Sequence, residues 1–230
     1  MMRIVGRAIQ GFAAGLLLLV FVLLIHVQVV SYSVSYYQSE FAKLSRPEAL
    51  GTSIDELARF SRHTTRYLSG REEDPNVSLV LQGQERPLLN EREIAHMEDV
   101  QKLFGLARGL TIAGTSFFAL SLLLSWKWGK LCKFLRSLAW TSAFALIIGL
   151  VFGLLISRDF TAAFDQFHWL AFTNDLWQLD PAKDQLINLL PEQFFADAVM
   201  LAATRTAVSL LLISATASFA SIRPNRPKLS

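Results

Sequence analysis

Residues 8–30 read AIQGFAAGLLLLVFVLLIHVQVV, an apolar run long enough to cross a membrane as a helix. Three further runs of this kind occupy residues 105–125, 137–157 and 199–221. Because about 20 helical residues span the hydrocarbon core of a bilayer, each run predicts one membrane-spanning helix. The sequence therefore predicts an all-α membrane protein with four transmembrane helices.

The composition of the 230-residue chain agrees with this class, since 52% of its residues are apolar and only 18% are charged. Soluble domains hold about 45–50% apolar and about 25% charged residues. The apolar run from Phe12 to Val30 exceeds the ~7–15 residues at the core of a secretory signal, and no A-x-A-like cleavage site follows it. We therefore expect this run to stay in the protein as a helix. The lone cysteine, Cys132, excludes a disulfide framework and a cysteine metal cluster.

The charges are divided unequally between the segments that flank the apolar runs. Residues 1–7, 126–136 and 222–230 carry lysines and arginines but no acidic residue, and all 19 acidic residues lie in 31–104 and 158–198. Short basic segments remain on the cytoplasmic side of a membrane. We therefore expect both termini inside the cell and both large loops outside, where the loops form a cap on a single membrane domain, 1–230.

The first outer loop begins with Tyr32, Tyr36 and Tyr37, which are typical of an aromatic belt at the membrane interface. Further along, the stretch VSLVLQGQERPL at 77–88 predicts a short pair of strands that turns at its Gln-Gly pair. The loop is therefore expected to hold secondary structure of its own.

Two helix starts are predicted within this loop. Ser53 with Glu56 forms a capping box, which predicts a helix that ends before Gly70. Asn90 with Glu93 predicts a second helix start, and this helix should run without a break into the second apolar run.

The second outer loop contains FHWLAFTNDLWQLDPAKDQLINLLPEQFF at 167–195, a stretch rich in aromatic and acidic residues. A plain linker between membrane helices is short, polar and poor in rings, so this stretch indicates a site. Asp180 followed by Pro181 predicts the start of a helix, whose apolar face comes from the leucines and isoleucine that follow.

Two of the four histidines are candidates for chemistry. His96 and Asp99 share one face of the helix before the second apolar run, as a catalytic pair or as a surface ion pair. His168 lies on the other outer loop, also near a membrane edge, so the two imidazoles can converge on one site and act as base and acid near neutral pH. For His26 and His63 we expect packed or solvated imidazoles.

Polar residues of the second loop and of the fourth apolar run also need interpretation. Asp180 is a helix cap or a reactive group, and Asp184 supports the same turn. Asn174 offers its amide to an oxyanion or closes an Asx-turn. Arg205, inside the fourth apolar run, is costly in lipid, so it has a function or pairs with an outer acidic residue.

The rings of the second loop fit either a belt at headgroup level or the wall of a lipid pocket. They are Phe167, Trp169, Phe172, Trp177, Phe194 and Phe195. The chain contains no HExxH motif, no G-x-S-x-G elbow and no P-loop, and no serine or cysteine beside a histidine suggests a covalent nucleophile.

Two motifs give the chain a family resemblance. The pattern H-M-x-D-V begins at His96, and F-H-x3-F-x-N-D-L-W-x-L-D-P-x2-D covers 167–184. With its four spans, the chain resembles the lipoprotein intramolecular transacylase (Lit) family of bacterial membrane proteins. The resemblance implies an enzyme that moves the sn-2 acyl chain of a diacylglyceryl-modified lipoprotein onto the α-amino group of its N-terminal cysteine. It places the two catalytic histidines on His96 and His168.

The resemblance also implies where the enzyme works and what it needs. The site is expected on the outer face of the bacterial plasma membrane, with no metal, no cofactor and no nucleic acid partner. Asp99, Asn174, Asp180 and Asp184 are expected to support or orient the imidazoles. The pocket is expected to be lined by the rings named above and by Arg205.

Two alternatives from other classes stay open at this point. A metal-dependent membrane hydrolase would use nitrogen and oxygen ligands from His96, Asp99, His168 and Asp180. A non-catalytic membrane protein would use the same outer loops to bind a partner protein.

Overall fold

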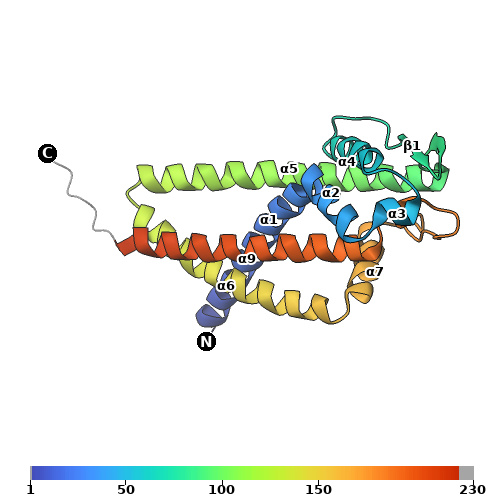
Figure 1. Ribbon diagram of the computed structural model, residues 1–230. Coiled ribbons are helices and arrows are strands. Elements are labelled where there is room, and N and C mark those ends of the chain that lie inside the picture. Colours follow the sequence, from blue (N-terminus) through green and yellow to red (C-terminus); the bar gives the residue numbers. More distant parts are fainter. Residues whose placement is uncertain (1, 223–230) are drawn as a thin grey trace. The chain divides into compact units, whose positions relative to one another are not determined.

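The computed structural model describes residues 2–222, which form helices and one short hairpin (Figure 1). Four helices are long and apolar enough to cross a membrane, as the sequence predicts. They are α1 (Met2–Ser31), α5 (Glu91–Lys127), α6 (Leu131–Arg158) and α9 (Glu192–Ile222). Residue 1 and residues 223–230, which hold parts of the two terminal basic segments, lie outside the described residues.

Helix α5 is longer than a membrane requires. Its 37 residues correspond to about 55 Å at ~1.5 Å per residue, whereas the hydrocarbon core is about 30 Å thick. The apolar part of α5 is 105–125, and the turns before it carry charges. Those first turns therefore extend out of the hydrocarbon core, as expected for a helix that begins in an outer loop.

The chain divides into two compact units. The first, which we call the membrane unit, comprises Met1–His26, Leu110–Ser157 and Ala203–Ser230. The second, which we call the cap unit, comprises Val27–Gly109 and Arg158–Ala202. Both predicted outer loops lie within the cap unit, and the organisation as one membrane domain stays a prediction.

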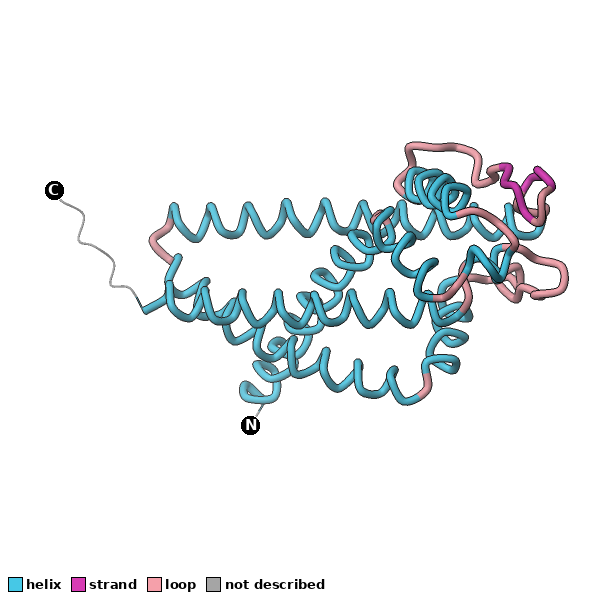
Figure 2. Tube along the Cα trace, viewed as in Figure 1, coloured by secondary structure: helices cyan, strands magenta, loops and turns pink. Residues whose placement is uncertain are grey.

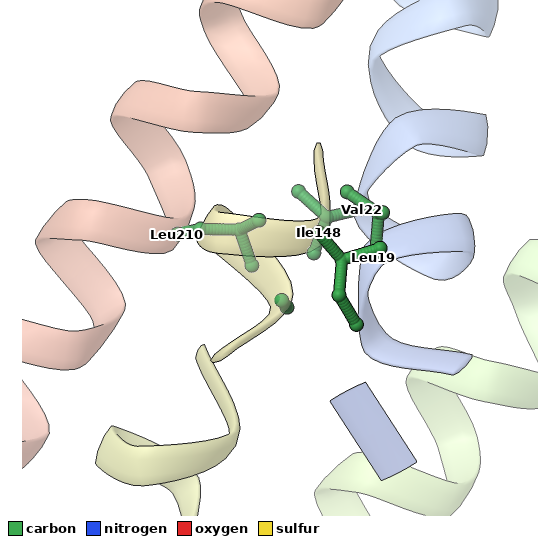
Figure 3. Close-up of a cluster of buried hydrophobic side chains, with 5 residues drawn as sticks. Leu19, Val22, Ile148 and Leu210 are labelled. Carbon is green, nitrogen blue, oxygen red and sulfur yellow. The ribbon is translucent and has the colours of Figure 1, made fainter. Parts of the chain in front are cut away.

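The membrane unit is held together by close packing of small and branched side chains. A buried cluster joins α1, α6 and α9 (Figure 3), and its members are Leu19, Val22, Ala145, Ile148 and Leu210. Gly114 of α5 lies so close to Phe21 of α1 that a Cβ there would be 2.6 Å from the ring. Such close approach is what drives helices together where lipid offers no hydrophobic gain.

The cap unit holds the remaining elements, and Figure 2 shows its one strand pair in magenta among the described residues. The elements are α2 (Val34–Lys43), α3 (Arg46–Leu50), α4 (Ile54–Leu68), β1 (Ser78–Leu81), β2 (Gln84–Pro87), α7 (Phe160–Ala171) and α8 (Leu186–Leu189). The long helices α5 and α9 begin in this unit.

Local signals in the first loop fold as predicted. The Ser53 hydroxyl accepts the Glu56 N–H at the start of α4, and Gly70 follows α4 with a φ of +73°. The hairpin turns at Gln82 and Gly83, which both have positive φ. Two positive φ angles match the right-handed twist of a tight hairpin and favour glycine.

The predicted interfacial belt is wrong for Tyr36 and Tyr37. Both lie on α2, a helix that the sequence analysis did not predict, and both are buried. The Tyr36 hydroxyl donates to the carbonyl of Phe194 at 2.7 Å, and the Tyr37 ring lies 5.0 Å from the Phe194 ring. These tyrosines therefore anchor α2 to the start of α9.

The second loop is less helical than predicted after Asp180. Instead of a helix from Pro181, the chain forms a turn at 180–184 and then the four-residue α8. The Asp184 carboxylate accepts the Asp180 N–H at 2.7 Å, and the Asp180 carboxylate accepts the Ala182 N–H at 2.9 Å. Because both side chains bond to the backbone of the turn, they stabilise the turn in place of a continued helix.

A buried carboxylate joins the second loop to the start of α5. The predicted Asn90–Glu93 cap is present, since Glu93 accepts the Asn90 N–H at 2.8 Å. Its second oxygen accepts the Leu186 N–H at 2.6 Å, and the Asn90 amide donates to Asp184 at 2.7 Å. Glu93 is 1% exposed, so these bonds replace its lost hydration.

We predict that Glu93→Ala destabilises the protein by about 2 kcal/mol, because it leaves the buried N–H of Leu186 without its acceptor. For a chain of this size that loss corresponds to a fall in Tm of about 4–8 °C, measured by thermal unfolding in detergent. Glu91→Ala removes an exposed carboxylate from the same turn and should change stability by less than about 0.5 kcal/mol. Equal Tm values for the two variants would contradict the role of Glu93.

Candidate active site

The structure brings the two candidate histidines together inside the cap unit. His96 lies on the second turn of α5 and His168 lies on α7. Their ring centroids are 6.3 Å apart with an interplanar angle of 36°. His96 is 7% exposed and His168 is 8% exposed. Two imidazoles from loops that are distant in sequence therefore share one buried place.

The tautomer of His168 is fixed by the backbone of its own helix. Its Nδ1 lies 2.7 Å from the carbonyl oxygen of Phe164, one turn earlier on α7. A carbonyl oxygen only accepts hydrogen bonds, so Nδ1 carries the proton. In the neutral ring Nε2 then keeps a free lone pair, which is the form that a general base needs.

Burial favours the neutral form of the His168 imidazole. It lowers the pKa of His168 below its usual value of about 6.5. The Phe164 carbonyl and the Asp165 carboxylate favour the charged form, but these effects are smaller. His96 is as deeply buried, and burial disfavours the charged form of an imidazole in the same way.

Aromatic rings surround the histidine pair. Trp177 stacks on His168 with ring centroids 4.9 Å apart and an interplanar angle of 27°. Phe164 lies one helical turn before His168, and the two ring centroids are 4.2 Å apart. Phe172 contacts both histidines, at 5.7 Å from His168 and 5.3 Å from His96. Aromatic rings therefore enclose both imidazoles.

The other predicted pocket rings lie at different depths. Phe167 contacts His168 at 5.3 Å, and the largely exposed Trp169 contacts Trp177 at 5.4 Å. Phe195 contacts Phe164 and so lies in a second layer. Phe194 packs instead into the tyrosine cluster of α2.

Two buried nitrogens of the site have no hydrogen-bond partner among residues 2–222. They are Nδ1 of His96 and Nε1 of Trp177. Buried polar groups in folded proteins are almost always bonded, so each exception requires an explanation. Both nitrogens belong to rings of the enclosure.

The predicted orienting role of the aspartates is wrong for His168, because a backbone carbonyl performs it. Asp99 accepts from Lys102 at 3.0 Å and from the Asn174 amide at 2.8 Å. Within the part of the chain that the structure describes, no hydrogen bond joins His96 to an aspartate. Asp99 therefore fastens the second loop to α5 beside the site.

Asn174 closes an Asx-turn, the simpler of its two predicted readings. Its carbonyl oxygen accepts the Leu176 N–H at 3.2 Å while its amide donates to Asp99. Asp180 and Asp184 accept backbone N–H groups within the turn at 180–184 and cap no helix. These acids build the loop that carries Trp177.

Two features of this region were not predicted from the sequence. Arg92 donates to the carbonyl of Asp175 and lies 3.6 Å from its carboxylate. Glu93 was recognised as a cap, but its bond to Leu186 was not expected. Arg92 lies one helical turn before His96, and that spacing was the available signal.

The remaining polar candidates are two histidines and Arg205. His26 bonds to Ser209 at 2.9 Å, and His63 donates to the carbonyl of Asp74 at 2.8 Å. Arg205 belongs to the membrane unit and is exposed on α9. Its place in the substrate pocket stays a prediction.

The ligand set of the metal-dependent alternative does not assemble. Across residues 2–222, no group of three or more His, Cys, Asp or Glu side chains has the arrangement of a metal site. His96, Asp99, His168 and Asp180 are thus not gathered around one point. The geometry favours acid–base chemistry by the histidine pair.

Comparison with known families agrees with this geometry. The sequence model of the lipoprotein intramolecular transacylase Lit matches residues 12–195. The chain belongs to this family. It is therefore a membrane-integral acyltransferase that acts on lipoproteins.

Solved structures show the same fold. The membrane-integral Lit from Bacillus cereus is 22% identical, with a TM-score of 0.76 over 91% of this chain and 93% of that chain. A variant of that enzyme with one histidine replaced by alanine is 20% identical, with a TM-score of 0.70 over 94% and 96%. No curated protein sequence matches this Lit-family chain.

The burial of His168 predicts how stability depends on pH. Because the pKa of His168 is lowered in the folded state, the unfolded chain binds more protons below about pH 6.5. This group therefore makes stability fall as the pH drops below about 6.5 and has no effect well above it.

We expect the Tm of the wild type to fall more than that of His168→Gln between about pH 7.5 and about pH 5, since glutamine does not titrate. Thermal unfolding at both pH values in one detergent measures the difference. An equal fall in both proteins would show that burial does not penalise the charged form of His168.

Proposed function

We propose that His96 and His168 together catalyse the transfer of the sn-2 acyl chain from the glyceryl oxygen to the cysteine α-amino group of a lipoprotein. The observation that carries this proposal is the buried ring pair, 6.3 Å apart and enclosed by aromatic side chains. The nucleophile is the amine of the substrate, so the protein needs to supply only proton transfer, charge stabilisation and confinement.

In this proposal His168 is the general base. A free α-amino group has a pKa of about 7.7–8.0, so a fraction of it is the neutral nucleophile near neutral pH. The neutral imidazole takes the proton that the amine nitrogen loses as it bonds to the acyl carbon. The proton goes to Nε2, because Nδ1 already holds one. The Phe164 carbonyl then stabilises the imidazolium through the same bond, as a buried acceptor does for a catalytic histidine elsewhere.

His96 has the complementary role at the departing oxygen. A neutral imidazole carries a proton on one nitrogen and can donate it in a hydrogen bond. The new bond joins the cysteine nitrogen to the acyl carbon, and the bond from that carbon to the sn-2 oxygen breaks. His96 protonates that oxygen as the bond breaks, and the His168 imidazolium restores the proton of His96. The net transfer is one proton from the amine to the glyceryl hydroxyl.

In this proposal the ring enclosure lowers the entropy cost of bringing the amine and the ester together. The amine and the ester belong to one flexible substrate, so they react only when its head region is folded. Well-oriented groups reach effective molarities of about 10⁵–10⁸ M, equivalent to about 7–11 kcal/mol. Phe172 contacts both imidazoles and Trp177 covers one, which supports exclusion of water that would hydrolyse the ester.

The charge pattern supports an outer location for this site. The short segment between α5 and α6 holds Lys130 and no acid. The acidic residues fall within the ranges of the cap unit. By the positive-inside rule we propose that the histidine pair faces the outside of the bacterial plasma membrane and that both termini face the cytoplasm.

Mass spectrometry of a lipoprotein N-terminus tests the proposal. In cells that make the wild-type enzyme we expect a cysteine that is N-acylated and singly O-acylated. His96→Ala and His168→Ala should each lower the rate of its formation by at least about 10²-fold, because general acid–base groups contribute ~10²–10⁴-fold.

His63→Ala is the matched control, since it removes a histidine of the same unit whose partner is the carbonyl of Asp74. All variants are compared at equal membrane abundance. A diacylglyceryl cysteine with a free amine in the wild-type strain would refute the activity. Full activity of both site variants would instead fit the non-catalytic alternative.

A further inference from the structure

We infer that the indole N–H of Trp177 binds the carbonyl oxygen of the migrating acyl group and stabilises the oxyanion formed when the amine attacks. This assigns to Trp177 a catalytic role beyond that of a pocket wall, and it rests on the proposed acyl transfer. Trp177 contributes a hydrogen-bond donor, whereas the two histidines transfer the protons.

The first observation is the state of the indole nitrogen. Nε1 of Trp177 is buried and has no acceptor among residues 2–222. A buried tryptophan N–H usually has a hydrogen-bond partner, because its desolvation is otherwise uncompensated. A donor left unpaired beside the candidate base is therefore suited to a substrate acceptor.

The second observation is the orientation of the indole ring. Trp177 lies nearly parallel to His168, at 27°, with centroids 4.9 Å apart. This contact uses the face of the indole, whereas its N–H points along the ring plane. The N–H therefore does not bond to the imidazole, although the centroids of the two rings are only 4.9 Å apart.

The third observation is that the side-chain donors of Asn174 and Arg92, which lie on the same loop and helix start, are already engaged. The Asn174 amide donates to Asp99, and the Arg92 guanidinium donates to the carbonyl of Asp175. Asn174 was the candidate oxyanion donor from the sequence, but its bonds hold the loop. The indole N–H only donates, and an ester carbonyl only accepts, so their chemistry is complementary.

The same bonds hold Trp177 in place before substrate binds. Asn174 accepts the Leu176 N–H at 3.2 Å, and the Gln178 N–H donates to the Asp175 carbonyl at 3.0 Å. These bonds bracket Trp177 on both sides in sequence. A donor fixed in advance stabilises developing charge without the cost of reorganisation.

The test is Trp177→Phe, which keeps an aromatic ring and removes the N–H. With a synthetic diacylglyceryl-cysteinyl peptide in detergent, we expect kcat to fall by about 10²–10³-fold, as for loss of one oxyanion donor, and KM to change little. Trp140→Phe makes the same substitution at an exposed tryptophan of α6 and should leave both constants unchanged.

A rise in KM with kcat unchanged would overturn the inference, since it would show that the ring acts only as a wall. So would wild-type kinetics in Trp177→Phe. Neither result would affect the proposed acyl transfer, which depends on the activity of the wild type and of the histidine variants.

A second variant covers the case in which Trp177→Phe fails to fold. Replacing Trp177 by the isosteric benzothienylalanine, through an expanded genetic code, exchanges the N–H for sulfur and keeps the bicyclic ring. We expect the same loss of kcat with an unchanged Tm. Full activity of this variant would refute the role of the N–H.

Discussion

The site depends on one buried carboxylate at the start of α5. Glu93 caps its own helix through Asn90 and also accepts the N–H of Leu186 from the second loop. A carboxylate with 1% exposure is tolerated only when its oxygens are bonded. One of these bonds is made at the helix start and the other to the second loop. The stability of the helix start and the position of the second loop are therefore coupled. His96, one turn beyond Glu93, lies on the helix start that these bonds fasten to the second loop.

The histidine pair shows how a membrane enzyme can keep a base neutral in an apolar site. A carboxylate hydrogen-bonded to His168 would raise its pKa more than the Asp165 charge does, and it would be costly to bury among rings. The Phe164 carbonyl fixes the tautomer without adding a charge. The aspartates are used elsewhere, at the edge of the site, where Asp99 and Asp184 bind the second loop to α5. The site thus separates the groups that hold the loop from those that handle protons.

Features that follow from short-range patterns could be predicted from the sequence, including the four spans, the α4 cap and the hairpin turn. The burial of Tyr36 could not, because it depends on Phe194, which is 158 residues away. The turn at 180–184 was not predicted either. It forms in place of the expected helix because the carboxylates of Asp180 and Asp184 bond to its backbone. For the site, residue types and motifs indicated the histidines, but the acceptor of His168 is a carbonyl and leaves no mark in the sequence.

The central claim is that His96 and His168 act as one unit on one substrate. A double-mutant cycle tests it most directly, with initial rates of acyl transfer measured for His96→Ala, His168→Ala and the double variant at one pH. Residues that act as a unit are strongly non-additive, so we expect the double variant to be about as slow as the slower single variant. A double variant whose loss equals the product of the two single losses would show that the histidines act independently.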